Sequence, residues 1–393
     1  MQDSPWLLPA GIDEMLPEDA RCLEKLRRRL LDLYDSWGYE LVIPPLIEFL
    51  ESLLTGTGSD LDIQTFKLTD QISGRMMGIR ADMTPQVARL DAHRLRRSAP
   101  TRLCYLGSVL HTLPDGFAGS RNPYQVGAEL YGHAGPESDA EVLCLMLETL
   151  KATGVQDVYV DLGHVGIYRE LARQAGLDQG QEAQLFDLLQ RKALPEMQAF
   201  LTGLKLERAA KDRLAALAML NGEAEVLAQA RSTLRGAGEI VTAAIDYVEK
   251  VAGLVTRRLP GALLHYDLAE LRGYHYQTGV VFAAFVPGYG QEVARGGRYD
   301  DIGKIFGRPR PATGFSADLQ SLIVLVNEKA SPRTAIFAPA VNDPALIARV
   351  EELRANGERV IFELPGQVNH LPEQGCDRIL AQRDGKWLVE PAK

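Results

Sequence analysis

The chain has 393 residues, of which 46% are hydrophobic and 24% are charged, a composition typical of a soluble globular protein with two or three domains. Its net charge of -9 argues against a protein that mainly binds a phosphate backbone, because such binding requires clustered Lys and Arg. The N-terminus has no basic and apolar leader, and no apolar run reaches about 18 residues. The four cysteines are scattered without a CxxC pair. We therefore expect a cytoplasmic protein that has no metal site and no cofactor.

One amphipathic helix and several short strands are predicted in the first third of the chain. Leucines recur three or four residues apart over 17–37, which predicts a helix that Gly38 ends. The apolar and β-branched segment 39–43 predicts a strand that ends at Pro44. Further strands are expected at 64–68, 75–79, 102–111 and 125–131, with one helix at 84–95 that Thr84 would cap. Short strands separated by turn residues favour an antiparallel sheet.

The second half of the chain changes character twice. Residues 177–258 are rich in Ala, Leu, Gln, Glu, Lys and Arg, which predicts a helical insertion between two parts of one sheet domain. Strands are expected again at 263–268, 277–286 and 291–295, before a helix at 316–326. A strand-helix-strand pattern follows at 335–338, 344–356 and 359–362. We therefore expect a sheet domain over 1–330 and a small α/β domain over 331–393.

Two glycine-containing segments carry the most informative local pattern. Residues 271–276 read Leu-Arg-Gly-Tyr-His-Tyr, and residues 294–300 read Ala-Arg-Gly-Gly-Arg-Tyr-Asp. Glycine beside arginine and tyrosine suits a turn where the backbone approaches a polar ligand and a cation faces a carboxylate. Either segment alone is more simply explained as a surface hairpin turn.

Together the two segments resemble the histidine-specific signatures of histidyl-tRNA synthetases, and four other segments match that family in the same order. Residues 38–49 resemble the first class II motif, which builds the dimer interface in the family, and residues 80–84 resemble a loop that contacts the α-amino group. Residues 124–129 resemble the strand after the second motif, and 314–319 the start of the third. The resemblance covers about 5–330. It implies an α+β fold in which an antiparallel sheet is flanked by helices and carries a helical insertion, with a small C-terminal α/β domain.

The resemblance also implies a histidine pocket. Acceptors for the α-ammonium, a forked donor for the carboxylate and an aromatic face for the imidazole would come from six residues: Asp82, Thr84, Gln125, Glu129, Arg272 and Tyr276. Arg121 and Arg298 remain as possible anion-binding residues. The alternative is that these side chains only keep inherited hydrogen bonds that stabilise the fold.

Two arginines that hold the ATP phosphates in this class are replaced. The Phe-Arg-x-Glu pattern of the second motif aligns with residues 110–113, so His111 takes one arginine position, and Ser321 takes the arginine position of the third motif. Adenylation requires positive charge on the phosphates, so we expect no catalytic residues. The C-terminal region is also shorter than the anticodon-binding domain of a synthetase.

The predicted histidine pocket is retained, whereas the arginines that would bind ATP are replaced. This combination predicts a regulatory protein rather than an enzyme. The family that combines these features is the regulatory subunit of ATP phosphoribosyltransferase, which acts in the first step of histidine biosynthesis. We therefore expect a homodimer that joins a short-form catalytic subunit in a hetero-oligomer, is inhibited by histidine and has no nucleic-acid or membrane partner. A divergent active histidyl-tRNA synthetase and a tRNA-sensing paralogue are the alternatives.

Overall fold

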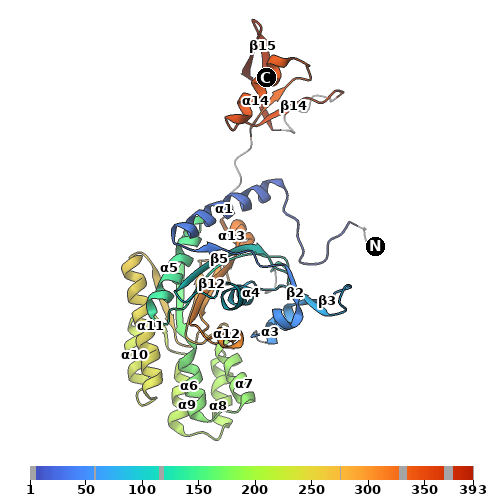
Figure 1. Cartoon of the computed structure of the whole chain (residues 1–393). Helices are drawn as coiled ribbons and strands as arrows, with labels where there is room; N and C mark the ends of the chain where they lie inside the picture. Colours follow the sequence, from blue (N-terminus) through green and yellow to red (C-terminus); the bar gives the residue numbers. More distant parts are fainter. Residues whose placement is uncertain are drawn as a thin grey trace. The chain divides into compact units, whose positions relative to one another are not determined.

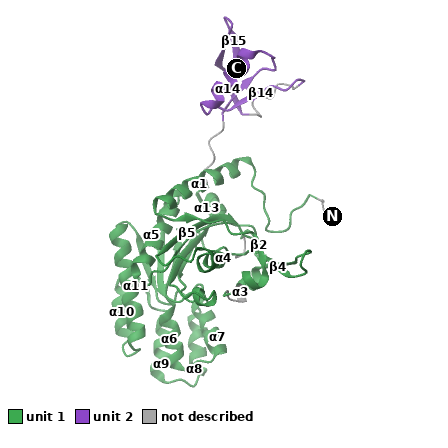
Figure 2. Cartoon of the chain, in the orientation of Figure 1, with its two compact units in different colours: residues 1–328 green, residues 329–393 purple. Residues whose placement is uncertain are grey.

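The computed structural model describes residues 6–56, 59–114, 119–274, 276–326, 334–366 and 375–392. The chain forms two compact units, residues 1–328 and 329–393 (Figure 2). The domain boundary predicted at residue 330 falls within 327–333, outside the described residues.

A nine-stranded sheet forms the centre of the first unit (Figure 1). Its strands, in spatial order, are β1 (Glu40–Leu41), β5 (Thr101–Ser108), β6 (Tyr124–Tyr131), β12 (Ala312–Asp318), β11 (Ala294–Arg298), β10 (Val280–Phe285), β7 (Tyr159–His164), β9 (Leu263–Asp267) and β8 (Asn221–Gly222). All pairs from β5 to β7 are antiparallel, whereas β1 with β5 and β7 with β9 are parallel. The predicted antiparallel sheet is therefore confirmed, with parallel pairs toward its two sides.

The two faces of this sheet are buried by different helices. One face packs on α1 (Pro17–Ser36), α5 (Pro136–Ala152), α11 (Glu239–Arg258) and α13 (Leu319–Val326). The other face packs on α4 (Thr84–Leu90), the π-helical turn Asp91–Leu95 and α12 (Ile302–Ile305). Successive residues of β5 show the alternation, because Cys104 belongs to the first core and Tyr105 to the second.

The helical insertion lies between β7 and β9. It contains α6 (Val165–Ala175), α7 (Gln179–Gln190), α8 (Leu194–Gly203), α9 (Arg208–Leu217) and α10 (Glu225–Thr233), followed by α11. Asp178 begins α7 with a capping box, since its side chain accepts from the Gln181 N–H and Gln181 reaches back to the Asp178 N–H. The sequence-predicted helical character of 177–258 is confirmed, apart from the two residues of β8.

A separate antiparallel sheet of three strands holds part of the predicted strand run. Its order is β2 (Ile47–Phe49), β4 (Met76–Ile79) and β3 (Phe66–Thr69), and it is accompanied by α2 (Leu50–Leu53) and α3 (Ser59–Gln64). The strands predicted at 64–68 and 75–79 are therefore real, but they do not join the large sheet. The loop after β4 leads directly into α4, and this connection supplies part of the site described below.

Two local predictions were wrong. Thr84 does not cap α4: it is the first helical residue, and its own N–H donates to Asp82 Oδ1 at 2.9 Å. The helix predicted from residue 316 begins only at Leu319, because residues 316–318 complete β12. Asp318 causes the change from strand to helix, since its carboxylate accepts the N–H groups of Gln320 and Ser321 at 3.1 Å each.

The second unit is a four-stranded sheet with one helix. The strand order is β14 (Val360–Phe362), β13 (Ala335–Ala338), β15 (Cys376–Arg383) and β16 (Lys386–Pro391), and α14 (Pro344–Ala355) packs on it. The predicted strand-helix-strand pattern is confirmed, and β15 and β16 extend it. Trp387 Nε1 donates to Asp343 Oδ2 at 2.7 Å, which ties the last strand to the start of α14.

Candidate functional site

A buried carboxylate lies at the centre of the candidate site. Glu129 on β6 is 1% exposed, and its Oε1 accepts from the Tyr105 hydroxyl on β5 at 2.9 Å. Its Oε2 accepts from the Tyr299 hydroxyl, just beyond the end of β11. Both donors are neutral hydroxyls. No described guanidinium or ammonium group contacts this carboxylate.

The environment of Glu129 opposes its ionised form. Burial, helped by the nearby charge of Asp82 and opposed by the two tyrosine hydroxyls, raises the pKa of this carboxyl to about 8. A carboxylate without a counter-ion is costly in a site of low dielectric. The site therefore has a strong preference for a cationic group or a proton beside Glu129.

Two glycines make this arrangement possible. Gly314 on β12 pairs directly with Glu129, and a Cβ atom there would lie 1.5 Å from Glu129 Oε2. Gly127 pairs with Tyr105, and a Cβ atom there would lie 2.4 Å from the Tyr105 hydroxyl. The carboxylate and the ring thus occupy the space that side chains would fill on the neighbouring strands.

A chain of hydrogen bonds connects Glu129 to the loop before α4. Tyr105 also shares a 3.0 Å hydrogen bond with Thr84 Oγ1. Gln125 Nε2 donates to Asp82 Oδ1 at 2.7 Å, and Gln125 Oε1 accepts from the Met83 N–H at 2.9 Å. Together with the contact of Asp82 to the Thr84 N–H, these bonds bring four of the predicted residues into one network.

Tyr276 joins the same site through its ring. It stacks on Tyr299, with ring centroids 4.9 Å apart and an interplanar angle of 24°. Its hydroxyl oxygen is buried without a hydrogen-bond partner among the described residues. Burial, followed by the charge of Glu129, raises the pKa of the Tyr276 hydroxyl well above its ordinary value. An uncharged, unpartnered hydroxyl is therefore available to hydrogen-bond a ligand.

Arg272 makes its contacts elsewhere. Its Nη1 donates to Glu270 Oε2 at 2.5 Å, its Nε lies 3.5 Å from Glu292 Oε2, and its guanidinium lies over the Phe285 ring at 5.1 Å. No contact among the described residues joins it to the Asp82–Glu129 network. The predicted role in binding a ligand carboxylate would require that carboxylate to compete with two protein carboxylates.

The two possible anion-binding arginines are both engaged by the protein. The Arg298 guanidinium is 6% exposed and forms a 2.9 Å ion pair with Asp139, and its remaining N–H groups donate to Ser138, Asp300 and the carbonyls of His133 and Gly135. Arg121 donates to the carbonyls of His111 and Ala10 at 3.1 and 3.0 Å. These contacts leave Arg298 with no N–H for an anion.

The positions expected to hold the ATP-clamping arginines carry locally bonded side chains. His111 Nε2 is 2.9 Å from the Ala81 carbonyl oxygen, so this nitrogen carries the hydrogen. The Ser321 hydroxyl donates to Asp318, whose other oxygen accepts from the Tyr124 N–H at 3.0 Å. Neither side chain can offer the forked, permanently charged donor of an arginine.

Tyr105 and Tyr299 are the two site residues that sequence reasoning did not select. Tyr299 lies in the quoted motif of residues 294–300, and Tyr105 lies in an apolar strand where an aromatic residue is usually core. The pairing of Gly127 with Tyr105 is the signal that identifies Tyr105, but it depends on knowing the strand register.

The sheet order, the motif positions and the tyrosine-lined carboxylate define a class II synthetase-like protein of the histidyl type, with His111 and Ser321 at the two positions where phosphate-clamping arginines are expected. A family model described as Histidyl-tRNA synthetase matches residues 11–322, and one described as ATP phosphoribosyltransferase subunit HisZ C-terminal domain matches residues 333–390. The ATP phosphoribosyltransferase regulatory subunit of Thioalkalivibrio sulfidiphilus is 63% identical over 388 residues, with 98% of each chain covered. That of Pseudomonas aeruginosa is 55% identical, also with 98% of each covered. The chain belongs to the family of ATP phosphoribosyltransferase regulatory subunits.

Solved structures agree with this fold. A crystal structure from Bacillus halodurans, described as an ATP phosphoribosyltransferase regulatory subunit/histidyl-tRNA synthetase, has a TM-score of 0.86 at 27% identity, covering 96% of this chain and 98% of that chain. A histidyl-tRNA synthetase from a Nostoc species has a TM-score of 0.77 at 17% identity, covering 98% and 97%, and shows the fold alone. The predicted α+β fold of the class II synthetase type is confirmed.

The described residues include neither a metal-type cluster of side chains nor a membrane-spanning helix. No group of three or more His, Cys, Asp or Glu side chains is placed to hold a metal ion there. Within the same residues, every helix is too short or too polar to span a membrane.

Proposed function

We propose that this chain is the regulatory subunit of an ATP phosphoribosyltransferase in histidine biosynthesis and that it senses histidine in the Asp82–Glu129 pocket. Phosphoribosyl transfer takes place on a short-form catalytic chain with which this subunit forms a hetero-oligomer in the cytoplasm. The family membership supports the regulatory role. The observation that carries the proposal is the hydrogen-bond network that joins Asp82 and the buried Glu129, two acidic side chains that no described cation contacts. His111 and Ser321 stand at the positions where the resemblance predicts phosphate-binding arginines.

The charge of the pocket favours a cationic ligand. Asp82 and Glu129 are both acidic, and among the described residues the hydrogen bonds to Glu129 come from neutral hydroxyls. A histidine ligand offers an ammonium group to acceptors such as Asp82, Thr84 and Gln125, while its imidazole suits the stacked tyrosines and the unpartnered Tyr276 hydroxyl. Arg272 can bind the ligand carboxylate only if its hydrogen bond to Glu270 breaks and is replaced by one to the ligand.

A protein that binds histidine without reacting it acts on flux through a partner. Histidine must bind one conformation of the complex more tightly than another, and the difference in affinity sets the change in transferase activity. A coupling free energy of about 1 to 3 kcal/mol is usual and corresponds to roughly a 5- to 150-fold effect. Feedback inhibition by histidine follows if the tighter-binding conformation is the less active one.

The first-motif region supplies an apolar surface for a homodimer. Leu41, Ile43, Leu46 and Ile47 are exposed by 41%, 79%, 48% and 39%. Four large apolar side chains within seven residues form the kind of patch that marks an interface. A two-fold symmetric contact through this patch buries it on both copies.

The test is a reconstitution. The catalytic chain is assayed alone, with this subunit, and with this subunit plus histidine, while assembly is followed by sedimentation. We expect assembly with the subunit, a changed rate, and inhibition by histidine that requires the subunit. Failure of the two chains to assemble, or identical rates and histidine sensitivity in all three assays, would overturn the proposal.

A further inference from the structure

Helix α1 carries three cations on one face that have no acidic partner. Arg21, Lys25 and Arg29 follow one another at intervals of four residues, which places them in one row along the helix. Among the described residues, none of them forms an ion pair and the buried Arg21 Nε has no hydrogen-bond partner. Arg29 Nη1 donates to the Ala152 carbonyl at 2.8 Å. By contrast, Arg27 and Arg28 on the same helix both pair with Glu24, at 3.6 and 2.8 Å.

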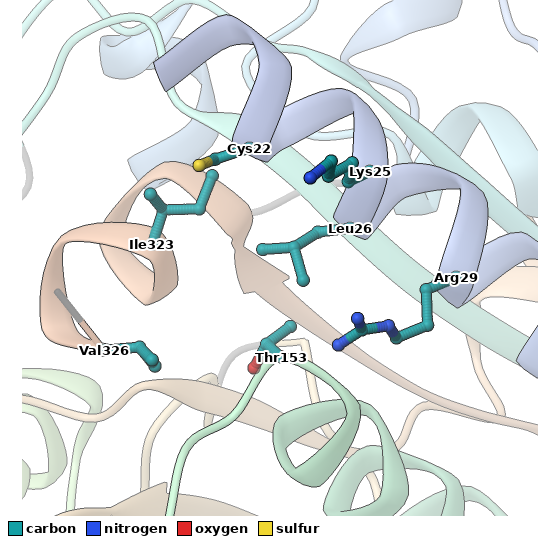
Figure 3. A pocket seen from close by; sticks show the side chains of 7 residues that line it. All are labelled: Cys22, Lys25, Leu26, Arg29, Thr153, Ile323 and Val326. Atoms are coloured by element: carbon teal, nitrogen blue, oxygen red, sulfur yellow. The ribbon is translucent and has the colours of Figure 1, made fainter. Parts of the chain in front are cut away.

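A hollow lies beside this row (Figure 3). It is bounded by α1, by the turn after α5 and by α13, and it is a small hollow, partly open to solvent, with a cavity volume of about 40 Å³. Leu26, Ile323 and Val326 form its apolar part, and Lys25 and Arg29 line it from α1.

The row is electrostatically unfavourable in the isolated chain. Like charges four residues apart on a helix repel one another, and the chain has 52 acidic residues against 43 basic ones, so carboxylates were available to pair with these cations. An anionic group from outside would relieve the repulsion and give Lys25 a partner. The adjacent apolar surface would at the same time bury a large apolar side chain.

We propose that this hollow docks an acidic segment of the transferase chain, with an apolar side chain between Leu26, Ile323 and Val326 and its neighbouring carboxylates against Lys25 and Arg29. The inference rests on the proposed function, because it names the partner. The site is separate from the histidine pocket. Leu26 belongs to the core on one face of the large sheet, whereas Tyr105 and Tyr299 belong to the core on the other.

A short covalent and hydrogen-bonded path joins the docking site to the pocket. Helix α13, which carries Ile323 and Val326, begins next to Asp318, and Asp318 accepts the backbone N–H of Tyr124. The next residue along β6 is Gln125, which binds Asp82 in the pocket. A shift of α13 on docking therefore reaches the pocket through one carboxylate.

Two double variants with equal net charge test the proposal. Lys25→Gln with Arg29→Gln removes two cations from the hollow, and Arg27→Gln with Arg28→Gln removes two cations from the same helix outside it. The dissociation constant for the catalytic chain is measured for wild type and both variants at low and high salt. We expect the first variant to bind at least tenfold more weakly with a smaller salt dependence, and the second to stay within about twofold of wild type.

Controls separate the possible failures. Thermal midpoints and histidine affinities of the two isolated variants show whether each still folds, and Val326→Ser probes the apolar side of the site at a half-buried residue that lines it. Equal affinity of wild type and the Lys25/Arg29 variant for the catalytic chain would overturn this inference and leave the proposed function intact. If wild type itself does not bind the catalytic chain, the proposed function fails instead.

Discussion

Replacing Glu129 with glutamine removes the buried charge and changes little in shape. In the wild-type chain without ligand, burial raises the pKa of the Glu129 carboxyl from 4.5 to about 8. The folded chain therefore retains a proton that the unfolded chain has released between those pH values. The stabilising contribution is complete below pH 4.5 and is lost as the pH rises to about 8.

The size of the effect follows from the shift. At 1.36 kcal/mol for each pH unit, this rise corresponds to about 5 kcal/mol as an upper limit, and the effective value is lower if the site relaxes. The Glu129→Gln variant lacks this titration, so its stability relative to wild type should increase as the pH is raised from 5 to 9. The same substitution should weaken histidine binding. The variant should bind histidine less tightly than wild type by about 1 to 3 kcal/mol, because the ligand cation loses its partner.

Two measurements test the reasoning. Urea unfolding of both proteins at a series of pH values gives the stability difference, and calorimetry in buffers of different ionisation enthalpy gives the protons released when histidine binds. Wild type should release more protons than the variant below pH 8, since a bound cation favours ionised Glu129. A stability difference that does not change with pH would refute the assigned titration, and equal histidine affinities would place the ligand elsewhere.

Three further predictions concern activation, assembly and stability. The purified chain should show no histidine-dependent exchange of pyrophosphate into ATP. The double variant His111→Arg with Ser321→Arg should not restore this exchange, because Leu113 stands where the second motif has glutamate. Exchange by the wild-type chain would contradict the loss of catalysis. Ile43→Asp should yield a monomer in sedimentation at micromolar concentration, whereas Ile72→Asp, at a position that is 97% exposed, should not; a monomeric wild type would refute the proposed dimer. Arg310→Met should lower the free energy of unfolding by about 3 to 5 kcal/mol in urea, because it removes the cation 2.8 Å from buried Asp91 and leaves that carboxylate only Arg308, at 4.0 Å. Lys304→Met, which removes an exposed pair with Asp301, should have little effect, and equal losses in the two variants would contradict the role of burial.

The fold could be predicted because its signals are local or repeated. Helix α1 follows from leucine spacing, and the insertion follows from composition over about 80 residues. The cap of α4 and the start of α13 were wrongly predicted because an aspartate before each helix binds the first N–H groups: Asp82 at α4 and Asp318 at α13. Thr84 has the residue type of a cap, and only its contact with Tyr105 shows why its hydroxyl is used elsewhere.

The site was predicted in part for a related reason. Residue type and motif order identified Asp82, Gln125 and Glu129, which the structure brings into one network. The environment of Arg298 could not be read from the sequence, because its ion pair joins residues 159 positions apart. The ion pair between Arg272 and Glu270 depends on side-chain geometry after β9. The sequence places the two charged residues close together but does not indicate where either side chain points.

The direct opposition of Gly314 and Glu129 limits how members of this family can diverge. A Cβ atom at residue 314 would overlap Glu129 Oε2. A side chain at position 314 therefore requires either a shorter residue at position 129 or a wider separation of β6 from β12. The two positions should therefore covary in homologous chains. A relative with a side chain at 314 should lack the buried carboxylate and, with it, the cation preference of the pocket. Glycine at this one position should thus be a sequence marker for relatives that retain the buried carboxylate.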